Sequence, residues 1–287
     1  MSKKIWQKMT TAGFLAMGLC MMAGTVQANY VQTNKSKDCG GGGSTTGCYT
    51  WTFDSQSDVT SGVNGGAPAN ITSTPAGFSN TVGSANINLA SAYIGSWPGG
   101  LGVGNADEGG ANATQPNHAV DNSGNTDSIL FTFNKLVNLD SFTSGYVNTD
   151  SDFTVFAWMG TGTPNSLAGQ AYNALQSGWQ LIGNYYQADG GSNSQINHSF
   201  ANDVYSSYWL IGALNTYANG VDQTKVGNDF FKILSLAGCD CSTAPPNTPG
   251  CGGTTNHNPE PGTLLLMGAG LFGLTRIRAQ RAVRCAA

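Results

Sequence analysis

Apolar and polar residues alternate in short runs along the middle of this chain. The first run is Tyr49–Phe53 (YTWTF), and comparable runs recur as far as Ala237. Alternation with a period of two is typical of a strand that buries one face. The runs with this pattern are Tyr49–Phe53, Ala85–Tyr93, Ser128–Phe133, Leu136–Phe142, Phe153–Trp158, Trp179–Tyr186, Gln195–Phe200, Tyr205–Ala213 and Phe230–Ala237. About nine short strands separated by turn residues predict an all-β fold, an antiparallel β-sandwich of jelly-roll or immunoglobulin-like type over residues 48–238.

The segments between these runs are rich in glycine, asparagine and proline. Residues 62–80 and 97–125 hold few apolar side chains, so we expect both to be loops. Loops as long as the second are often functional in a compact domain. Asn134 and Lys135 separate two neighbouring runs, and we expect a tight turn there. Residues 168–175 favour a short helical turn.

The first 28 residues have the pattern of a secretory signal peptide. Its basic start, apolar run and small-residue cleavage site are, in order, Lys3, Lys4 and Lys8, then Thr11–Gly24, then Val26–Ala28. The apolar run is too short to span about 30 Å of hydrocarbon. We therefore expect cleavage between Ala28 and Asn29, followed by a flexible, Gly-rich leader over residues 29–47.

Residues 258–287 form a tail of three parts. These are the motif Pro259, Glu260 and Pro261, the apolar segment 262–274, and a basic end over 276–284 with Arg276, Arg278, Arg281 and Arg284, the only arginines of the chain. The prolines hold the motif extended, so it cannot continue the apolar segment as one helix. That segment would be about 20 Å long as a helix, which is short for a permanent span. The tail therefore predicts transient membrane insertion, with the arginines as a cytoplasmic stop.

This order of motif, apolar segment and basic end resembles the PEP-CTERM sorting signal of bacterial surface proteins. The resemblance implies that an exosortase recognises and processes the tail. It also implies delivery to the cell surface or extracellular polymeric matrix of a Gram-negative, biofilm-forming bacterium, with transient anchoring in the inner membrane. The basic residues here are more widely spaced than in most members, and Cys285 follows them.

Charge is distributed unevenly between the ends and the body. Residues 29–261 contain five lysines, no arginine and all 16 acidic residues, and five minus 16 gives a net charge of −11. Binding to nucleic acid depends on neutralising phosphates with basic side chains. The composition therefore excludes nucleic acid as a partner.

Five cysteines lie between the two ends, at Cys39, Cys48, Cys239, Cys241 and Cys251. In an exported chain such cysteines usually form disulfides. We expect one bridge between Cys39 and Cys48 and another joining Cys251 to Cys239 or Cys241, with one thiol left over. A zinc site that uses His257 is the rival interpretation. Residues 239–257, rich in Cys, Pro and Gly, are expected to form a stalk.

One segment has the composition of a calcium site. Asp121–Asp127 (DNSGNTD) places oxygen-bearing side chains at alternate positions, and two carboxylates precede it. The candidate ligands are Asp107, Glu108, Asp121, Asn125 and Asp127, with Asp150 and Asp152 as a lesser candidate pair. Calcium binds six to eight hard oxygen ligands, which this set could supply. The alternative is ordinary loop chemistry, in which Asp and Asn stabilise turns without a metal.

Signs of catalysis are weak. Asp107 and Glu108 are adjacent carboxylates with His118 nearby, but neighbours on a strand point to opposite faces. The chain lacks G-x-S-x-G, H-E-x-x-H and P-loop patterns. The tryptophans could stack on sugars if they were exposed, although aromatics at alternating strand positions are more often core.

We therefore expect an exported surface or matrix protein with a structural or adhesive role and no enzymatic activity. The first alternative is a calcium-dependent carbohydrate-binding module whose partner is exopolysaccharide. The second is a polysaccharide hydrolase.

Overall fold

The computed structural model describes residues 47–80, 88–187, 195–200, 202–225, 227–245, 248 and 250–251. All of them belong to the larger of two units of the chain, Asp38–Ala287. The expected signal peptide, most of the leader and the whole sorting tail lie outside the described residues. Among the described helices, none has the length and apolar character needed to cross a membrane.

Strands make up 49 % of the described structure and helices are few and short, which confirms the all-β prediction. The strands are β1 Cys48–Thr52, β2 Val63–Asn64, β3 Thr72–Ser79, β4 Ala90–Trp97, β5 Gly100–Gly104, β6 Val120–Asp121, β7 Asp127–Val147, β8 Phe153–Trp158, β9 Trp179–Tyr185, β10 Ile196–Ser199, β11 Ser206–Ala213 and β12 Phe230–Asp240. The helical turns are α1 Gln56–Ser61, η1 Ala106–Glu108, η2 Gly110–Asn112, η3 Tyr172–Ala174 and η4 Cys241–Thr243. The jelly-roll or immunoglobulin-like type of the sandwich stays a prediction.

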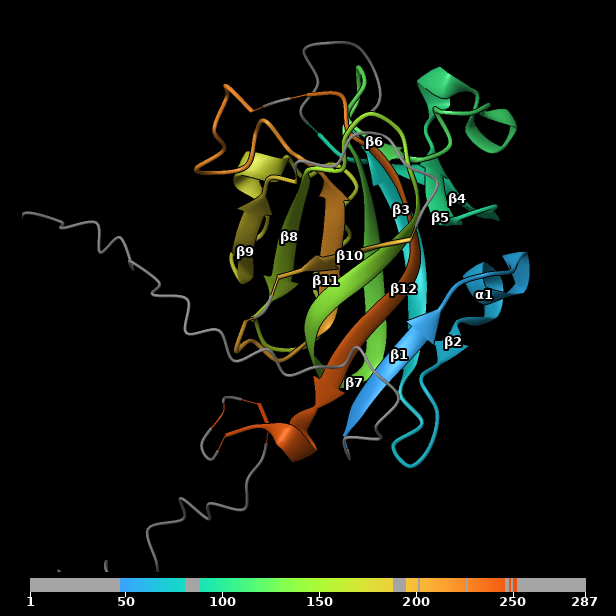
Figure 1. The fold of residues 1–287 in the computed structure, drawn as a ribbon. Helices are drawn as coiled ribbons and strands as arrows, with labels where there is room; N and C mark the ends of the chain where they lie inside the picture. Colours follow the sequence, from blue (N-terminus) through green and yellow to red (C-terminus); the bar gives the residue numbers. More distant parts are fainter. Residues whose placement is uncertain are drawn as a thin grey trace, which may run out of the picture. The chain divides into compact units, whose positions relative to one another are not determined.

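Strand β7 organises the sheet (Figure 1). It is 21 residues long, and its first half pairs with β3 and β11, so that Ile129 lies opposite Gly77 and Ile211. Its second half pairs with β12 and β10, so that Phe142 lies opposite Leu236 and His198. Because β12 also pairs with β5, the strands β12, β5, β4, β3 and β7 close a ring of hydrogen-bonded neighbours.

The tight turn expected at Asn134 and Lys135 is wrong, because β7 continues through both residues. Neither residue reverses the chain, and both side chains instead hold the segment before β3. The Asn134 side-chain oxygen accepts a hydrogen bond from the Thr72 N–H at 3.0 Å, and Lys135 Nζ donates to the Ala69 carbonyl at 2.7 Å. The two runs of alternating residues therefore belong to one strand.

The main hydrophobic core lies between the two halves of β7 and the strands paired with them. Phe131 from the first half packs against Phe53 with ring centroids 5.6 Å apart. Phe142 from the second half packs against Phe153 at 4.9 Å, and Phe131, Phe142 and Phe153 are all fully buried. The alternation of apolar and polar residues in the sequence therefore predicted which side chains face this core.

Four strands lie in segments expected to be loops, among them the two-residue strands β2 and β6. Strand β3 falls within residues 62–80, and β5 falls within residues 97–125. Glycine obscured β5, and the structure shows why glycine is needed there. A Cβ on Gly102 would lie 2.0 Å from the His118 carbonyl oxygen, and one on Gly104 would lie 2.1 Å from that of Gly110. The following loop packs directly on this strand.

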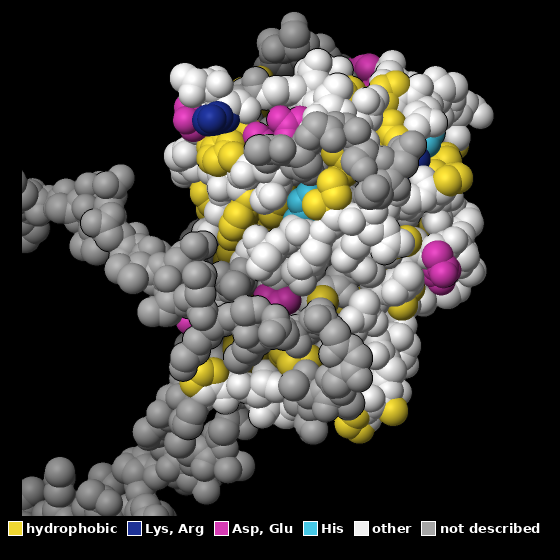
Figure 2. Space-filling model, viewed as in Figure 1, with side chains coloured by type: hydrophobic (Ala, Val, Ile, Leu, Met, Phe, Trp, Pro, Cys, Tyr) yellow, Lys and Arg dark blue, Asp and Glu magenta, His cyan; other side chains and the backbone are white. Residues whose placement is uncertain are grey.

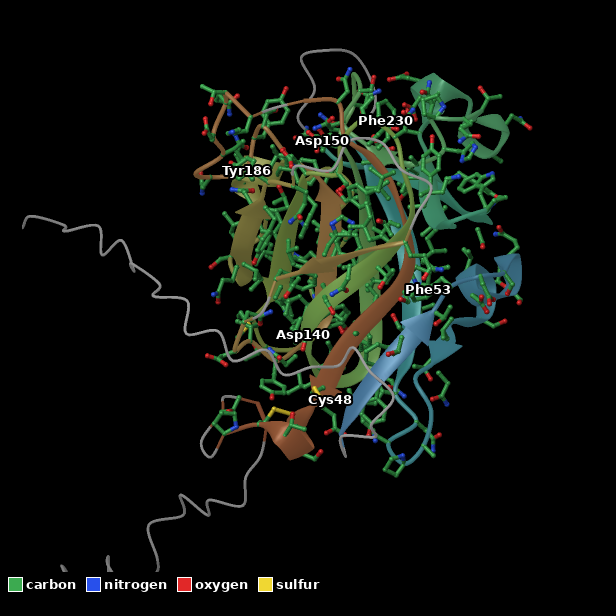
Figure 3. The ribbon with its side chains drawn as sticks, viewed as in Figure 1. Cys48, Phe53, Asp140, Asp150, Tyr186 and Phe230 are labelled. Atoms are coloured by element: carbon green, nitrogen blue, oxygen red, sulfur yellow. A yellow bond between two sulfur atoms is a disulfide. The ribbon has the colours of Figure 1, made fainter. Side chains whose placement is uncertain are left out.

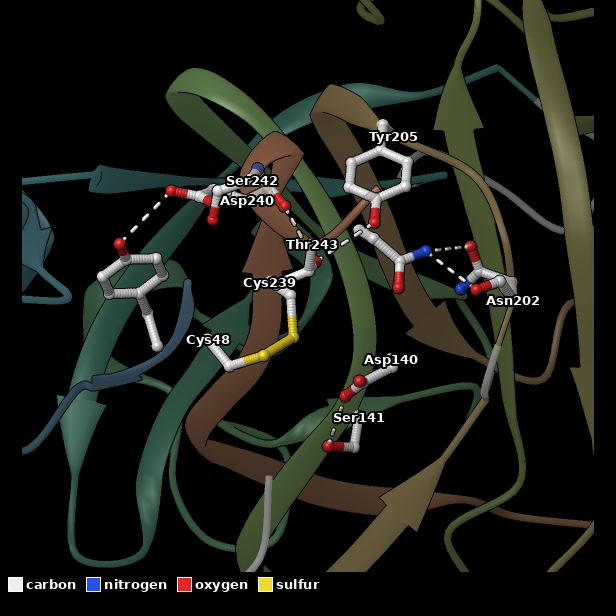
Figure 4. Close-up of a disulfide and its surroundings, with 11 residues drawn as sticks. Cys48, Asp140, Ser141, Asn202, Tyr205, Cys239, Asp240, Ser242 and Thr243 are labelled. Atoms are coloured by element: carbon white, nitrogen blue, oxygen red, sulfur yellow. Dashed lines mark hydrogen bonds between the residues drawn. A yellow bond between two sulfur atoms is a disulfide. The ribbon is translucent and has the colours of Figure 1, made fainter. Parts of the chain in front are cut away.

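Two disulfides hold the end of the domain that leads to the tail, and Figure 4 shows the one between Cys48 and Cys239. Cys48 on β1 bonds to Cys239 on β12, where the two strands already pair at that register. The expected Cys39–Cys48 bridge is therefore wrong, and Cys39 lies outside the described residues. The second disulfide joins Cys241 to Cys251, one of the two pairings expected for Cys251.

Candidate functional site

The loop between β5 and β7 is positioned by Asn105, which is fully buried. Its side-chain oxygen accepts a hydrogen bond from the Asp107 N–H at 3.1 Å and so caps η1. Its side-chain nitrogen donates to Asp127 Oδ1 at 3.2 Å. One side chain therefore fixes η1 relative to the first residue of β7.

Three carboxylates converge at this place, and we call them the Glu108 cluster. They are Glu108 at the end of η1, Asp121 at the end of β6 and Asp127 at the start of β7. Each contributes an oxygen that lies within 4.8 Å of the other two. Asp121 and Asp127 are fully buried, whereas Glu108 is partly exposed.

Each carboxylate of the Glu108 cluster keeps one buried oxygen without a hydrogen-bond donor among the described residues. Asp121 Oδ1 accepts from the Ser123 N–H at 2.9 Å, and Asp127 Oδ1 accepts from Asn105. The second oxygens, Asp121 Oδ2 and Asp127 Oδ2, and also Glu108 Oε2, accept no hydrogen bond of normal geometry from the described residues, although the Ser79 hydroxyl lies close enough to the Asp127 carboxylate to lower its pKa. Buried carboxylate oxygens are usually hydrogen-bonded or bound to a cation, so these three need an explanation.

Burial also changes the acidity of these groups. Burial raises the pKa of Glu108 to about 7, and burial together with the Glu108 charge raises the pKa of Asp121 to about 8. Burial, followed by the charges of Asp121 and Glu108, holds the pKa of Asp127 well above its ordinary value. Without a cation, the cluster therefore favours bound protons over negative charge.

The other two residues of the expected set, Asp107 and Asn125, are hydrogen-bonded to each other. Asn125 donates through Nδ2 to Asp107 Oδ2 at 2.9 Å, near the protein surface. The structure thus brings together Glu108, Asp121 and Asp127 from the expected set and pairs the other two with each other.

A second group of carboxylates, which we call the Asp229 cluster, consists of Asp150, Asp152 and Asp229. Asp150 lies at the end of the domain opposite Cys48, near Phe230 (Figure 3). Oxygens of the three residues again lie within 4.8 Å of one another. The sequence singled out Asp150 and Asp152 but missed Asp229, which is 77 residues from Asp152 and lies outside any local acidic pattern.

The Asp229 cluster is satisfied by protein donors. Asp229 Oδ1 accepts from the Asp152 N–H at 3.2 Å, and Asp229 Oδ2 accepts from Asn122 Nδ2. Asp152 Oδ1 accepts from the Gln187 N–H, and Asp150 Oδ1 accepts from the Ser151 N–H at 2.8 Å. Burial, followed by the charges of Asp152 and Asp150, raises the pKa of Asp229 to about 8.

The residues considered for catalysis or sugar stacking are divided between core and surface, with Trp97 and Trp179 half-buried and Asp107 exposed. His118 is buried and stacks on Trp97 with ring centroids 4.7 Å apart. Trp158 and Trp209 are buried, as expected for alternating strand aromatics. The large hydrophobic side chains exposed among the described residues are Tyr93, Met159 and Tyr186. On the face in Figure 2, hydrophobic side chains are scattered among polar ones.

The family model for the PEP-CTERM protein-sorting motif matches residues 259–281. The chain carries a PEP-CTERM sorting motif. The match includes Pro259, Glu260 and Pro261 and three of the four arginines, and Arg284 follows it. This motif indicates an exported protein that is targeted to an exosortase and sorted to the cell surface. No curated protein and no solved structure matches the chain.

Proposed function

We propose that this chain is a structural or adhesive protein of the bacterial cell surface or extracellular matrix, displayed after an exosortase processes its tail. The observation that carries the proposal is the PEP-CTERM motif at residues 259–281, which follows a disulfide-closed β domain. The motif directs the protein to the exosortase. The β domain is the part of the protein that carries out the function after the tail is removed.

The chemistry of the tail supports a temporary membrane stage. Pro259 and Pro261 keep the motif extended, in a form that a processing enzyme can bind as a strand. The apolar segment 262–274 enters the inner membrane, and the arginines remain on its cytoplasmic side. Cleavage near Pro261 then frees the domain from the membrane.

The β domain supports a role in structure or adhesion. Its first and last long strands, β1 and β12, are joined by the Cys48–Cys239 disulfide, and its core is built from both halves of β7. A disulfide that closes a long loop stabilises a domain mainly by restricting its unfolded state. Such a domain suits an exposed position outside the cell.

Intact mass of the protein recovered from the host's surface fraction tests the proposal. We expect loss of residues 1–28 and of everything from about Pro261 onward in cells that contain the exosortase. Cells without the exosortase should retain the tail, and so should a variant with Ala at Pro259, Glu260 and Pro261. An intact tail in normal cells, or identical processing without the enzyme, would overturn the sorting proposal.

A carbohydrate-binding module is the second candidate function, and one surface feature favours it. Tyr93 on β4 is 40 % exposed and packs edge-on against Trp97 with ring centroids 6.0 Å apart. Strand β4 lies against η2, in the same loop that carries the Glu108 cluster. Purified exopolysaccharide should bind in a calcium-dependent way if this function holds, and Tyr93→Ala should weaken the binding. Retention of the protein in the matrix without such binding would favour the structural role.

A further inference from the structure

We propose that the Glu108 cluster is a calcium site that ties the loop between β5 and β7 to the start of β7. The proposal rests on two independent observations. Oxygens of Glu108, Asp121 and Asp127 converge within 4.8 Å. The two aspartates are fully buried, and each has an oxygen without a hydrogen-bond donor among the described residues.

The local hydrogen bonds orient the cluster. The Ser123 N–H and the Asn105 side chain each occupy the Oδ1 atom of one aspartate. The Oδ2 atoms are left for another partner, as in metal sites where outer hydrogen bonds orient the ligands. Removing carboxylates from water without a compensating charge is costly, so three of them in one buried place call for a cation.

The ligand chemistry selects calcium over transition metals. All three groups are carboxylates, whereas zinc and copper sites in proteins usually include nitrogen or sulfur. Calcium accepts six to eight oxygens in irregular arrangements, whereas magnesium demands a near-ideal octahedron and retains its waters. Glu108 is partly exposed, so water can complete the coordination from that side. Calcium sites of extracellular modules have dissociation constants of about 10⁻⁴ to 10⁻³ M, a range that suits an exported protein.

Calcium binding would join three parts of the chain that are separate in the sequence. The ligands come from η1, β6 and β7, and the loop between Asn105 and Asp127 is rich in Gly, Asn and Asp. The loop would then be ordered by a ligand that is abundant outside the cell.

Calorimetric titration with calcium chloride tests the site on mature protein recovered from the surface fraction and stripped with EDTA. We expect one ion bound per chain. At a calcium concentration about 100 times the dissociation constant, the Tm should rise by about 5–10 °C. Neither heat of binding nor a change in Tm in the natural protein would overturn the proposal.

Three variants and a matched control locate the ion. Asp121→Asn, Asp127→Asn and Glu108→Gln keep the side-chain shapes, and each should weaken calcium binding at least about tenfold. Asp107→Asn removes the same charge from the neighbouring, exposed position and should bind calcium as the natural protein does. Glu108→Gln provides the decisive test if either buried variant fails to fold, because Glu108 is partly exposed. Unchanged binding in Glu108→Gln would overturn the site.

Discussion

The Glu108 and Asp229 clusters have the same composition at first sight but differ in how their oxygens are used. Each has three carboxylates with oxygens within 4.8 Å, and in each case burial raises at least one pKa to about 8. In the Asp229 cluster, N–H donors from Asn122 and Asp152 reach both oxygens of Asp229. In the Glu108 cluster, each carboxylate retains a buried oxygen that accepts no hydrogen bond of normal geometry from the described residues.

The difference shows that proximity of acidic side chains does not define a metal site. In the Asp229 cluster, N–H groups of the protein donate hydrogen bonds to the carboxylates and take the place that a metal ion would have. The cluster therefore has a structural role. The Glu108 cluster has donors for only half of its aspartate oxygens. We therefore expect calcium to bind at the Glu108 cluster and not at the Asp229 cluster.

The largest expected effect is on pH dependence in EDTA. The folded-state pKa values of Glu108 and Asp121, about 7 and about 8, lie above those of an unfolded chain, so the folded state binds more protons between pH 4 and pH 8. The free energy of unfolding should therefore fall as pH rises, by about 4 kcal/mol between pH 5 and pH 8. Calcium should remove the part of the fall that the Glu108 cluster contributes, whereas the part due to Asp229, whose pKa is also raised to about 8, should remain. Urea denaturation at several pH values measures it, and equal slopes with and without calcium would contradict the prediction.

The second largest effect is expected from removing the Asp229 carboxylate, which accepts hydrogen bonds in the Asp229 cluster. Asp229→Ala leaves the Asn122 and Asp152 donors buried without their acceptor, so we expect the free energy of unfolding to fall by about 3 kcal/mol. The loss should be the same in calcium and in EDTA. Asp203→Ala, which removes an exposed carboxylate, is the control and should change stability little. If the loss of stability in Asp229→Ala depended on calcium, the Asp229 cluster would take part in calcium binding and the prediction would be wrong.

A smaller effect is expected where Asn105 supports the Glu108 cluster. Asn105→Ala removes the η1 cap and the donor to Asp127 Oδ1, so it should cost about 1–2 kcal/mol. Calcium affinity should also fall about tenfold, because the ligand loses the hydrogen bond that orients it. Asn122→Ala, which disturbs the Asp229 cluster, should lose stability but keep its calcium affinity. Calorimetry on the two variants checks the contrast, which fails if both lose affinity equally.

The smallest effect is expected at Asn125, which the sequence offered as a ligand. Its side chain bonds to Asp107 near the surface, outside the Glu108 cluster. Asn125→Ala should therefore change the free energy of unfolding by less than about 0.5 kcal/mol and leave calcium affinity unchanged. A calorimetric loss of binding in this variant would show that the loop rearranges to bring Asn125 to the ion.

Strands with a full hydrophobic face could be predicted from the sequence. Phe153–Trp158 coincides with β8, and Tyr49–Phe53 nearly coincides with β1. Strand β5 could not, because three of its five residues are glycines that another backbone approaches closely, which leaves only Leu101 and Val103 to show an alternating pattern. The continuity of β7 was also hidden, because Asn134 and Lys135 have the composition of a turn but bond to the segment before β3.

The candidate site was predictable only where it is local. Asp121 and Asp127 lie in one short segment, and their spacing indicated a cation. Asn105 and Asp229 gave no signal, because their roles depend on hydrogen bonds to residues 22 and 77 positions away. The carboxylate oxygens of the Glu108 cluster that accept no hydrogen bond could be recognised only from the structure, which gives the positions of the donors around them.

The Cys48–Cys239 disulfide also has a mechanical consequence. It joins residues 191 positions apart, at the points where the chain enters and leaves the sheet. Tension applied between the leader and the tail end of the domain would pass through one covalent bond and bypass the strands. Unravelling would otherwise lengthen the chain by about 650 Å, at about 3.4 Å per residue. When such a surface protein is pulled between its two ends, this disulfide keeps the length of the domain almost unchanged.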